Sequence, residues 1–362
     1  MLEDEKKSSQ IAKYNPPTKK ASDEDLCYIS EIKHDYALTS TSSTEWDERI
    51  IDWGDLKEEE RNIEEVGIAC YTKNKKKFIR FEGGSDYYTM WDNVETICDC
   101  AFQSYYNEHI LIPCSIKILG DSIFWYPSIK ELVIPESVTK MTGNPFATCK
   151  FRLKCHSPNF YFDGNVLYDK EKKKIVSVMR NFQIIEENDP ITFSETVLVI
   201  ERNAFYDVSI SKPIVLPNSV LYIGFSAFYH ASIYEIKLGE MVIEIGEYAF
   251  AFSSIESIKL PNSLEILGKS AFSCCPLLKS VELSASLAII EEETFSGCNE
   301  INDIYIPEGV KEIRKRAFSS CKKLTNIYFP NSLEKIESEA FSLCGFKTIV
   351  IPKHTIVENG RR

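Results

Sequence analysis

Hydrophobic positions along most of the chain recur every 22 or 23 residues, a period far longer than that of a single helix or strand. Residues 301–321 and 324–344 align position by position, and their shared pattern is Φ-x-x-Φ-x-Φ-P-x-x-Φ-x-x-Φ-x-x-x-A-F-x-x-C, where Φ is aliphatic. Self-similarity at a fixed period predicts stacked structural repeats. One aromatic position holds ten of the 21 Phe residues: Phe102, Phe124, Phe146, Phe205, Phe228, Phe250, Phe272, Phe295, Phe318 and Phe341.

Each part of the repeat predicts a structure. The first hydrophobic group ends in alternation, as in Ile258-Lys-Leu260, which indicates a short strand with one buried face. Proline then ends the strand because it has no N–H for a ladder, and the Asn-Ser that often follows is typical of turns. A second hydrophobic pair returns along the opposite wall, and Ala-Phe closes the coil with its ring in the core. Stacked coils would bury a continuous core between parallel strands about 4.8 Å apart.

Several of these motifs resemble those of the BspA-like leucine-rich repeat family. They are the I-x-I-P strand ends, the stretch from Ser219 to Gly224, the Ala-Phe pairs and the Phe-x-x-Cys endings. The resemblance covers residues 86–352, although the Asn ladder of the commoner leucine-rich repeats is absent. It implies adhesion-type roles at the surfaces of anaerobic bacteria and parasitic protists, such as the binding of host or matrix proteins or of other cells.

The predicted fold is therefore a right-handed leucine-rich repeat solenoid, mostly β, with short parallel strands in each coil, a β-hairpin insertion and a small N-terminal cap. The 59-residue step from Phe146 to Phe205 holds the insertion, and its Asp163-Gly-Asn165 turn is similar to the D-G-V-L-Y segment of the family. We expect this hairpin to project from one edge of the solenoid. The predicted segments are 1–40, polar and disordered; 41–85, a cap with a short helix within 46–66 and a hairpin from 66–72 and 78–82; 86–150, repeats; 151–190, the hairpin insertion; and 191–362, repeats.

Charge is unevenly distributed and argues against nucleic-acid binding. The net charge is −12, of which residues 21–65 contribute −11 and residues 66–362 only −3. Nucleic-acid binding requires Lys and Arg clustered along one face. The single basic cluster, at residues 73–77, is short and is interpreted as a solvated turn.

Neither a secretory signal nor an apolar run long enough to span a membrane is visible, so the sequence favours a cytoplasmic protein. The family resemblance favours the alternative, a location at the cell surface. No polar cap follows Pro352, which leaves an open sheet edge at the C-terminal end and allows self-association there.

No arrangement of residues predicts catalysis, a cofactor or a metal site. The five His share no metal-like spacing with the 12 Cys, and Cys98-x-Cys100 and Cys274-Cys275 are not C-x-x-C pairs. Cys155-His156 is an unsuitable nucleophile–base pair because neighbours on a strand point to opposite faces. The Cys residues that recur every 23 positions are interpreted as buried, reduced thiols. An enzyme with its chemistry in residues 21–100 remains a remote alternative, since that segment has carboxylates but no partnered nucleophile.

Function is therefore predicted to lie in binding a protein partner. The strand position before the last hydrophobic residue is expected to face outward onto the concave sheet, and Tyr305 and Tyr328 should stack there on adjacent coils. An aromatic pair beside mixed charge is typical of a protein-binding hot spot, whereas the plain alternative is that Tyr and Val simply suit strand surfaces. The first hypothesis is adhesion-type recognition, and the alternative is an intracellular scaffold or adaptor. The predicted contact residues are Lys237, Lys259, Glu282, Tyr305, Tyr328 and Val350.

Overall fold

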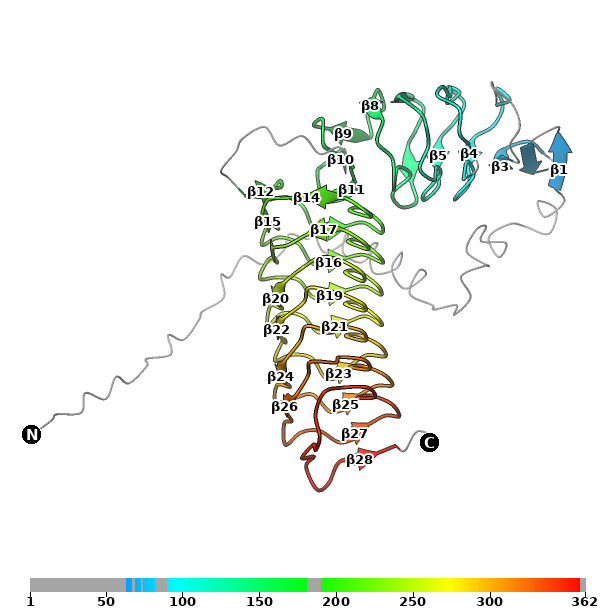
Figure 1. Cartoon of the computed structure of the whole chain (residues 1–362). Coiled ribbons are helices and arrows are strands. Elements are labelled where there is room, and N and C mark those ends of the chain that lie inside the picture. Colours follow the sequence, from blue (N-terminus) through cyan, green and yellow to red (C-terminus); the bar gives the residue numbers. More distant parts are fainter. Residues whose placement is uncertain are drawn as a thin grey trace, which may run out of the picture. The chain divides into compact units, whose positions relative to one another are not determined.

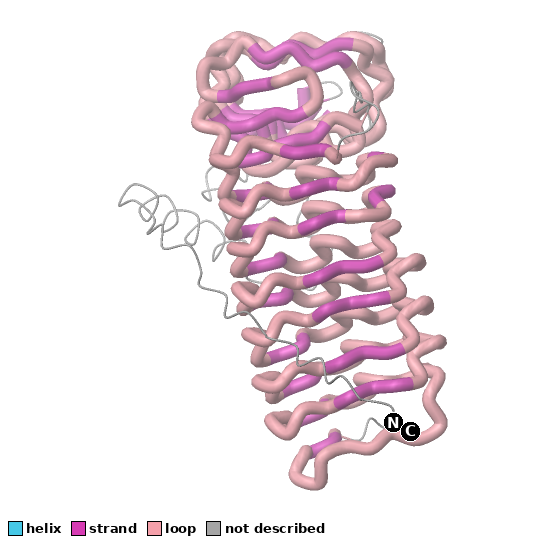
Figure 2. Tube along the Cα trace, turned by 90° about the vertical axis from the view of Figure 1, so that its left-hand side faces the viewer, coloured by secondary structure: helices cyan, strands magenta, loops and turns pink. Residues whose placement is uncertain are grey.

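A computed structural model describes residues 63–66, 69–72, 74–81, 90–103, 105–180 and 190–358, with only the backbone placed for 63–66. Within these ranges the chain forms short strands and turns and no helix (Figure 2). The predicted disordered segment 1–40 and most of the predicted helix lie outside the described residues. The last four positions of that helix prediction are wrong, because they form strand β1 (Ile63–Val66).

The N-terminal sheet joins a hairpin to the first coils. Strands β1, β2 and β3 pair antiparallel, and β3 then pairs parallel with β4, which begins a parallel series through β5 and β7. The hairpin strands are thus continuous with the repeat array. A second parallel pair, β6 with β8, lies on the other side of these coils. The bounds are β2 (Ala69–Thr72), β3 (Lys77–Phe81), β4 (Thr96–Ile97), β5 (Ile118–Leu119), β6 (Glu131–Ile134), β7 (Lys140–Met141) and β8 (Arg152–Cys155).

The later coils repeat two strand positions, which confirms the predicted solenoid (Figure 1). We call the strands before the turn residues the face strands: β12 (Ile191–Thr192), β15 (Ile214–Val215), β18 (Ile236–Lys237), β20 (Ser257–Lys259), β22 (Ser280–Glu282), β24 (Asp303–Tyr305) and β26 (Asn326–Tyr328). The returning segments are the wall strands: β13 (Val199–Ile200), β16 (Tyr222–Ile223), β19 (Glu244–Ile245), β21 (Ile266–Leu267), β23 (Ile289–Ile290), β25 (Glu312–Ile313), β27 (Lys335–Ile336) and β28 (Ile356–Val357). Two further short strands, β14 (Ser209–Ile210) and β17 (Ser232–Ile233), pair between adjacent coils. Right-handed winding stays a prediction.

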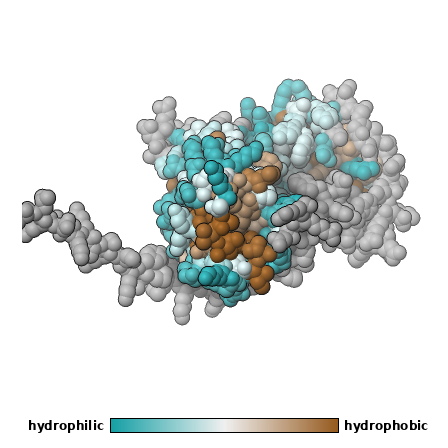
Figure 3. Space-filling view, turned by 60° about the horizontal axis from the view of Figure 1, so that its bottom comes forward, coloured by the Kyte–Doolittle hydropathy of each residue, from teal (hydrophilic) through white to brown (hydrophobic). Residues whose placement is uncertain are grey.

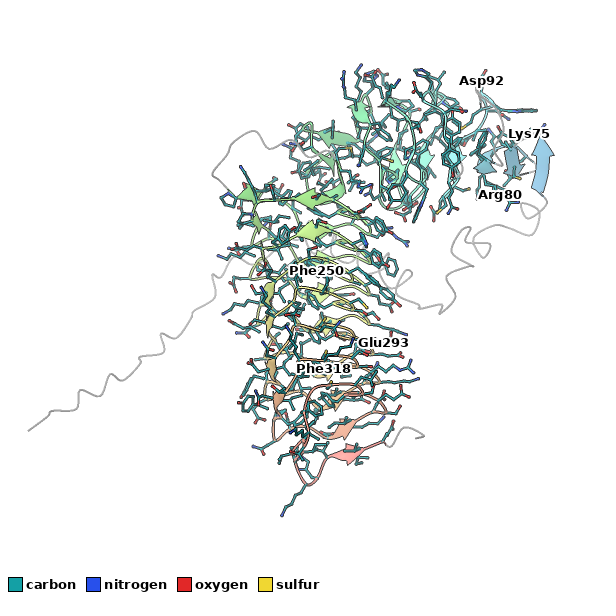
Figure 4. The ribbon with its side chains drawn as sticks, in the orientation of Figure 1. Lys75, Arg80, Asp92, Phe250, Glu293 and Phe318 are labelled. Atoms are coloured by element: carbon teal, nitrogen blue, oxygen red, sulfur yellow. The ribbon has the colours of Figure 1, made fainter. Side chains whose placement is uncertain are left out.

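The Phe position forms the core of the coils, as predicted. From Phe205 to Phe341 consecutive rings stack with centroids 4.4 to 5.5 Å apart and with planes within 20° of parallel. Figure 4 shows Phe250 and Phe318 inside the coils, and neither side chain is exposed. Each ring from Phe228 to Phe318 is thus covered on both faces by the rings of adjacent coils, and large buried rings dominate the energetics of such a core.

Two left-handed backbone positions flank each Phe from Phe205 to Phe341 and turn the chain around it. In the coil of Phe272, Ser270 has φ 53° and Cys274 has φ 55°, although neither residue is Gly. Such a conformation is costly for L-residues and persists only where surrounding bonds hold it. Here the N–H groups of Ser270, Phe272 and Cys274 donate to carbonyls of the next coil at 2.7 to 2.9 Å. The same three-amide ladder recurs in each coil from Phe205 to Phe318.

The insertion is built into the sheet and does not project, so that part of the prediction is wrong. Strands β9 (Phe160–Phe162), β10 (Val166–Asp169) and β11 (Lys174–Val178) form an antiparallel meander, and β11 pairs parallel with β13. Both faces of β10 and β11 are buried, whereas Tyr161 of β9 is exposed. Leu167 and Val176 pack into the core of the preceding coils, whereas Tyr168 and Ile175 pack into the core of the following ones. The meander therefore separates an N-terminal stack, residues 69–157, from a C-terminal stack, residues 190–358.

At this boundary side chains replace the amide ladder. The carbonyl of Ala204 accepts a bond from Val178 of β11 and not from a preceding Phe amide. The amide of Asn144 instead donates to Asp121 Oδ1 at 2.8 Å, and Asn203 Nδ2 donates to Asp121 Oδ2 at 2.8 Å. Gly143 makes room for this arrangement, since a Cβ there would lie 2.3 Å from Asp121 Oδ1. We call Asp121, Asn144 and Asn203 the junction cluster.

Candidate partner-binding face

The six predicted contact residues all lie exposed on the side of the face strands. Five of them lie at the ends of β18, β20, β22, β24 and β26, and Val350 follows one coil later outside any strand. Tyr305 and Tyr328 are 64% and 59% exposed, and Val350 is 89% exposed. The outward orientation follows from strand alternation, since Ile258 and Ile304 immediately before two of these positions are buried in the core.

Register brings two pairs of predicted contact residues together. Lys259 lies opposite Glu282, and the Lys259 Nζ to Glu282 Oε2 distance is 2.9 Å. The hydrogen bond that Lys259 donates to the Glu282 carboxylate raises the pKa of Lys259, but an ion pair this exposed contributes little to stability. Tyr305 lies opposite Tyr328, which confirms their predicted pairing on adjacent strands. The rings of Tyr305 and Tyr328, both within the described residues, do not stack on each other.

Polar side chains border the exposed column on its N-terminal side. The residues two positions earlier on each strand, such as Asp303 and Asn326, are exposed and in register. Beyond them, exposed ion pairs neutralise charge between coils: Lys279 with Glu256 at 2.8 Å, and Lys323 with Glu300 at 2.7 Å. The two Tyr side chains are therefore uncharged, exposed groups beside paired charges.

A second, only partly exposed cluster was not identified from the sequence. It consists of aromatic residues that follow the Phe position. Tyr206 and Tyr229 stack with centroids 5.2 Å apart, and Trp125 lies 6.4 Å from Tyr206. Asp207 links residues on the two sides of the boundary between the stacks. It accepts a hydrogen bond from Tyr126 Oη at 2.8 Å and forms an ion pair with Arg180 at 2.9 Å. The signal in the sequence was the aromatic residues that directly follow three of the Phe positions: Trp125 and Tyr126 after Phe124, Tyr206 after Phe205, and Tyr229 after Phe228.

The repeated cysteines are structural, as predicted. Cys298 Sγ donates to the carbonyl of Phe272, in the preceding coil, at 3.0 Å, and Cys275, Cys321 and Cys344 make equivalent bonds. All four are free thiols, and burial raises the pKa of Cys298 well above its usual range. A thiol of this kind is a poor nucleophile because it stays protonated.

Most of the segment 21–100, the remote enzyme alternative, lies outside the described residues, whereas Cys155 has unreactive surroundings. Burial raises the pKa of Cys155 as well, and its thiol points to the carbonyl of Ser157. Within the described ranges, no group of three or more His, Cys, Asp or Glu residues is arranged to hold a metal ion. The same residues include no helix long and apolar enough to cross a membrane.

One solved structure with a TM-score above 0.5 shares this architecture. A leucine-rich repeat protein from Eubacterium ventriosum is 22% identical, with a TM-score of 0.56 over 75% of this chain and 68% of that chain. A leucine rich cell surface protein from Faecalibacterium prausnitzii is also 22% identical and covers 75% and 59% of the two chains, with a TM-score of 0.37. The pneumococcal vaccine antigen PcpA is 17% identical over 74% and 66%, with a TM-score of 0.45. No curated protein sequence matches the chain.

The family assignment rests on the repeats themselves. The family described as BspA type leucine rich repeat region matches residues 84–189, 180–300 and 243–360. Solenoids of this kind present an extended surface, and leucine-rich repeats generally serve as non-enzymatic scaffolds that bind proteins. Because the match covers well over half of its residues, the chain belongs to the BspA-type leucine-rich repeat family.

Proposed function

We propose that the chain recognises a protein partner through its face strands, in an adhesion-type role at a cell surface. The contact residues are Lys237, Lys259, Glu282, Tyr305, Tyr328 and Val350. The observation that carries the proposal is the pair of exposed Tyr side chains in register on β24 and β26.

The chemistry of this pair suits a binding hot spot. Tyr offers a large, rigid contact surface with few rotatable bonds and a hydroxyl for hydrogen bonding, and Tyr is enriched among residues that dominate binding energy. The neighbouring ion pair between Lys259 and Glu282 supplies a polar rim. Rim charges of this kind set orientation and association rate more than affinity.

The free thiols of the repeat cysteines favour a second candidate, an intracellular scaffold with the same binding face. Thiols persist in reducing compartments, whereas exported proteins more often carry disulfides. Antibody labelling of cells before and after permeabilisation separates the two candidates. Labelling of intact cells supports adhesion, and labelling that requires permeabilisation supports the scaffold and removes the adhesin.

Replacement of both tyrosines tests the binding face. An immobilised panel of matrix proteins is first screened with the parent chain to select a partner. The double variant Tyr305→Ala/Tyr328→Ala is then expected to weaken binding to that partner by about 10-fold or more. The melting temperature should stay within about 2 °C of the parent, because both side chains are exposed. The matched control is Tyr106→Ala/Tyr161→Ala, which removes two exposed tyrosines from the N-terminal stack and the insertion. Equal affinity of the parent and the Tyr305/Tyr328 variant would remove this face as the site.

A further inference from the structure

The two exposed tyrosines of the proposed binding face belong to a group of four polar side chains on β24 and β26. Asp303 and Tyr305 are two residues apart on one strand, and Asn326 and Tyr328 are two residues apart on the next. The register sets Asp303 opposite Asn326 and Tyr305 opposite Tyr328. All four side chains are exposed, and strand alternation directs them to the same side of the sheet. We call these four residues the face block.

Asp303 carries an unbalanced charge. The strands β20, β22, β24 and β26 hold three charged residues, and two of them, Lys259 and Glu282, form an ion pair with each other. Asp303 forms no ion pair and no side-chain hydrogen bond within the described residues. The neighbouring Lys323 pairs with Glu300 at 2.7 Å and does not neutralise it. The face block therefore keeps a negative charge that a partner can complement.

The face block is also rich in hydrogen-bond acceptors. An ionised Asp carboxylate only accepts hydrogen bonds. Asn326 Nδ2 donates to Thr325 Oγ1 at 3.4 Å, which leaves Asn326 Oδ1 as an acceptor. Neither Tyr hydroxyl of the face block makes a hydrogen bond within the part of the chain that the structure describes. A side chain that brings several donors and a positive charge is therefore complementary to these groups.

The faces of both Tyr rings are available to a partner. The rings of Tyr305 and Tyr328 do not stack on each other, and neither makes an aromatic or cation–π contact among the described residues. A flat cation can pack on such a ring and is attracted by its negative face. Figure 3, in which the lower end of the C-terminal coils comes forward, shows hydrophilic residues bordering the hydrophobic ones. A partner that approaches the sides of these coils therefore meets polar groups.

We propose that the face block binds an arginine side chain of the protein partner, an inference that rests on the proposed function of the face strands. The guanidinium pairs with the Asp303 carboxylate, donates to Asn326 Oδ1 and packs on the ring of Tyr305 or Tyr328. Arginine fits better than lysine because its guanidinium is planar and carries donors in a fixed fork, whereas the lysine ammonium is a compact point charge. Tyr and Arg are both enriched among residues that dominate binding energy, and such residues tend to pair across interfaces.

Peptide selection on the full chain identifies the side chain that the face block prefers. A phage library of short random peptides is first depleted on the double variant Tyr305→Ala/Tyr328→Ala and then selected on the parent, so that the retained peptides require the two tyrosines. We expect these peptides to be enriched in arginine, and not in lysine, relative to the unselected library. In the tightest of them, replacement of the arginine by lysine, or by the uncharged and similarly shaped citrulline, should weaken binding about 10-fold or more.

Asp303→Asn tests the proposed contact directly. This variant should bind the arginine peptide about 10-fold more weakly than the parent does, but the citrulline peptide less than about 2-fold more weakly, because the charge pair is already absent there. The matched control is Glu235→Gln, which removes an exposed carboxylate at the equivalent position three coils earlier and should leave both affinities unchanged. The melting temperature of Asp303→Asn should match that of the parent, because Asp303 is exposed.

The outcomes separate the arginine contact from the proposed function. Retained peptides without enrichment in arginine would overturn the contact, and so would equal affinity of the arginine and lysine peptides. An Asp303→Asn variant that binds the arginine peptide as tightly as the parent, or a selection that retains no peptide at all, would overturn it as well. In each of these cases the proposed function still stands if binding of the matrix protein depends on Tyr305 and Tyr328. An equal loss of affinity in Glu235→Gln would contradict the assignment of the contact to Asp303.

Discussion

The C-terminal stack and the boundary between the stacks hold the same repeat together in different ways. In the C-terminal stack each coil finds an identical neighbour, so parallel Phe rings, backbone amides and thiol-to-carbonyl bonds repeat without special residues. At the boundary the neighbour is the meander β9–β11, and Asp121, Asn144 and Asn203 supply the missing bonds. Phe146 packs edge-on against Phe151 there, at 5.7 Å, and not face to face with Phe124.

The difference teaches that the repeat specifies only its own continuation. A coil bounded by another coil needs nothing beyond the consensus, because backbone groups meet backbone groups. A coil bounded by anything else leaves amides and carbonyls that particular side chains must satisfy, since unpaired buried polar groups are costly. Stability at the boundary should therefore depend on individual polar residues, whereas stability within the C-terminal stack should depend on packing.

The largest expected effect comes from breaking the stack of rings. Phe250 lies between Phe228 and Phe272, with centroid distances of 4.8 and 5.1 Å, and is fully buried. Phe250→Ala should lower the free energy of unfolding by about 3–5 kcal/mol, through lost burial and the cavity left behind. The control Phe252→Ala, two residues later and 43% exposed, should cost less than about 1 kcal/mol. Similar losses for both variants, measured by chemical denaturation, would contradict this account of the core.

The second-largest expected effect is a loss of stability at the boundary between the two stacks. Asn203→Ala removes the donor to Asp121 Oδ2 and leaves a buried carboxylate short of a partner, which should cost about 2 kcal/mol. Ser270→Ala is the matched control, because Ser270 has the same left-handed backbone and its buried hydroxyl has no hydrogen-bond partner. Its denaturation midpoint should be close to that of the parent. A Ser270→Ala variant as unstable as Asn203→Ala would trace the loss to the backbone position and not to the junction cluster.

Much of the fold could be predicted because its signals recur. The strand before each proline and the buried Phe and Cys positions appear in several repeats, so the prediction of each was supported by several independent occurrences in the sequence. Asp121, Asn144 and Asn203 each occur once in their roles, and a single polar residue in a repeat carries no periodic signal. The meander was mispredicted as a projecting hairpin, although Val166-Leu-Tyr168 and Ile175-Val-Ser-Val178 are apolar on both faces, as a buried sheet requires.

The candidate site was predictable only in part. Strand alternation was enough to place Tyr305 and Tyr328 outward and in register. It could not determine whether their rings touch, because rotamers depend on neighbours outside the repeat pattern. The aromatic cluster around Asp207 was missed because Trp125 and Tyr206 come from coils separated by the insertion.

The smallest effect is a pH dependence localised to the boundary. Burial raises the pKa of Asp121 to about 6, against the partial opposing effect of Arg202. A carboxyl whose pKa is higher in the folded state binds more protons when folded, so its contribution to stability is lost as the pH rises towards 6. Acidification from pH 7 to pH 5 should therefore raise the free energy of unfolding by about 1 kcal/mol through this group. The difference between the free energies of unfolding at pH 7 and pH 5 should be smaller in Asp121→Asn than in the parent. An unchanged difference would assign the effect to other groups.

Amide hydrogen exchange in Asn203→Ala measures the distinction between the two regions most directly. The amides of Asn144 and Phe146 depend on side-chain acceptors, whereas those of Phe228 and Phe250 donate to the backbone of the next coil. We predict that the variant loses protection at Asn144 and Phe146 and retains the protection of the parent at Phe228 and Phe250. Equal loss of protection in both regions would contradict the view that side chains hold the boundary while the repeat holds the C-terminal stack.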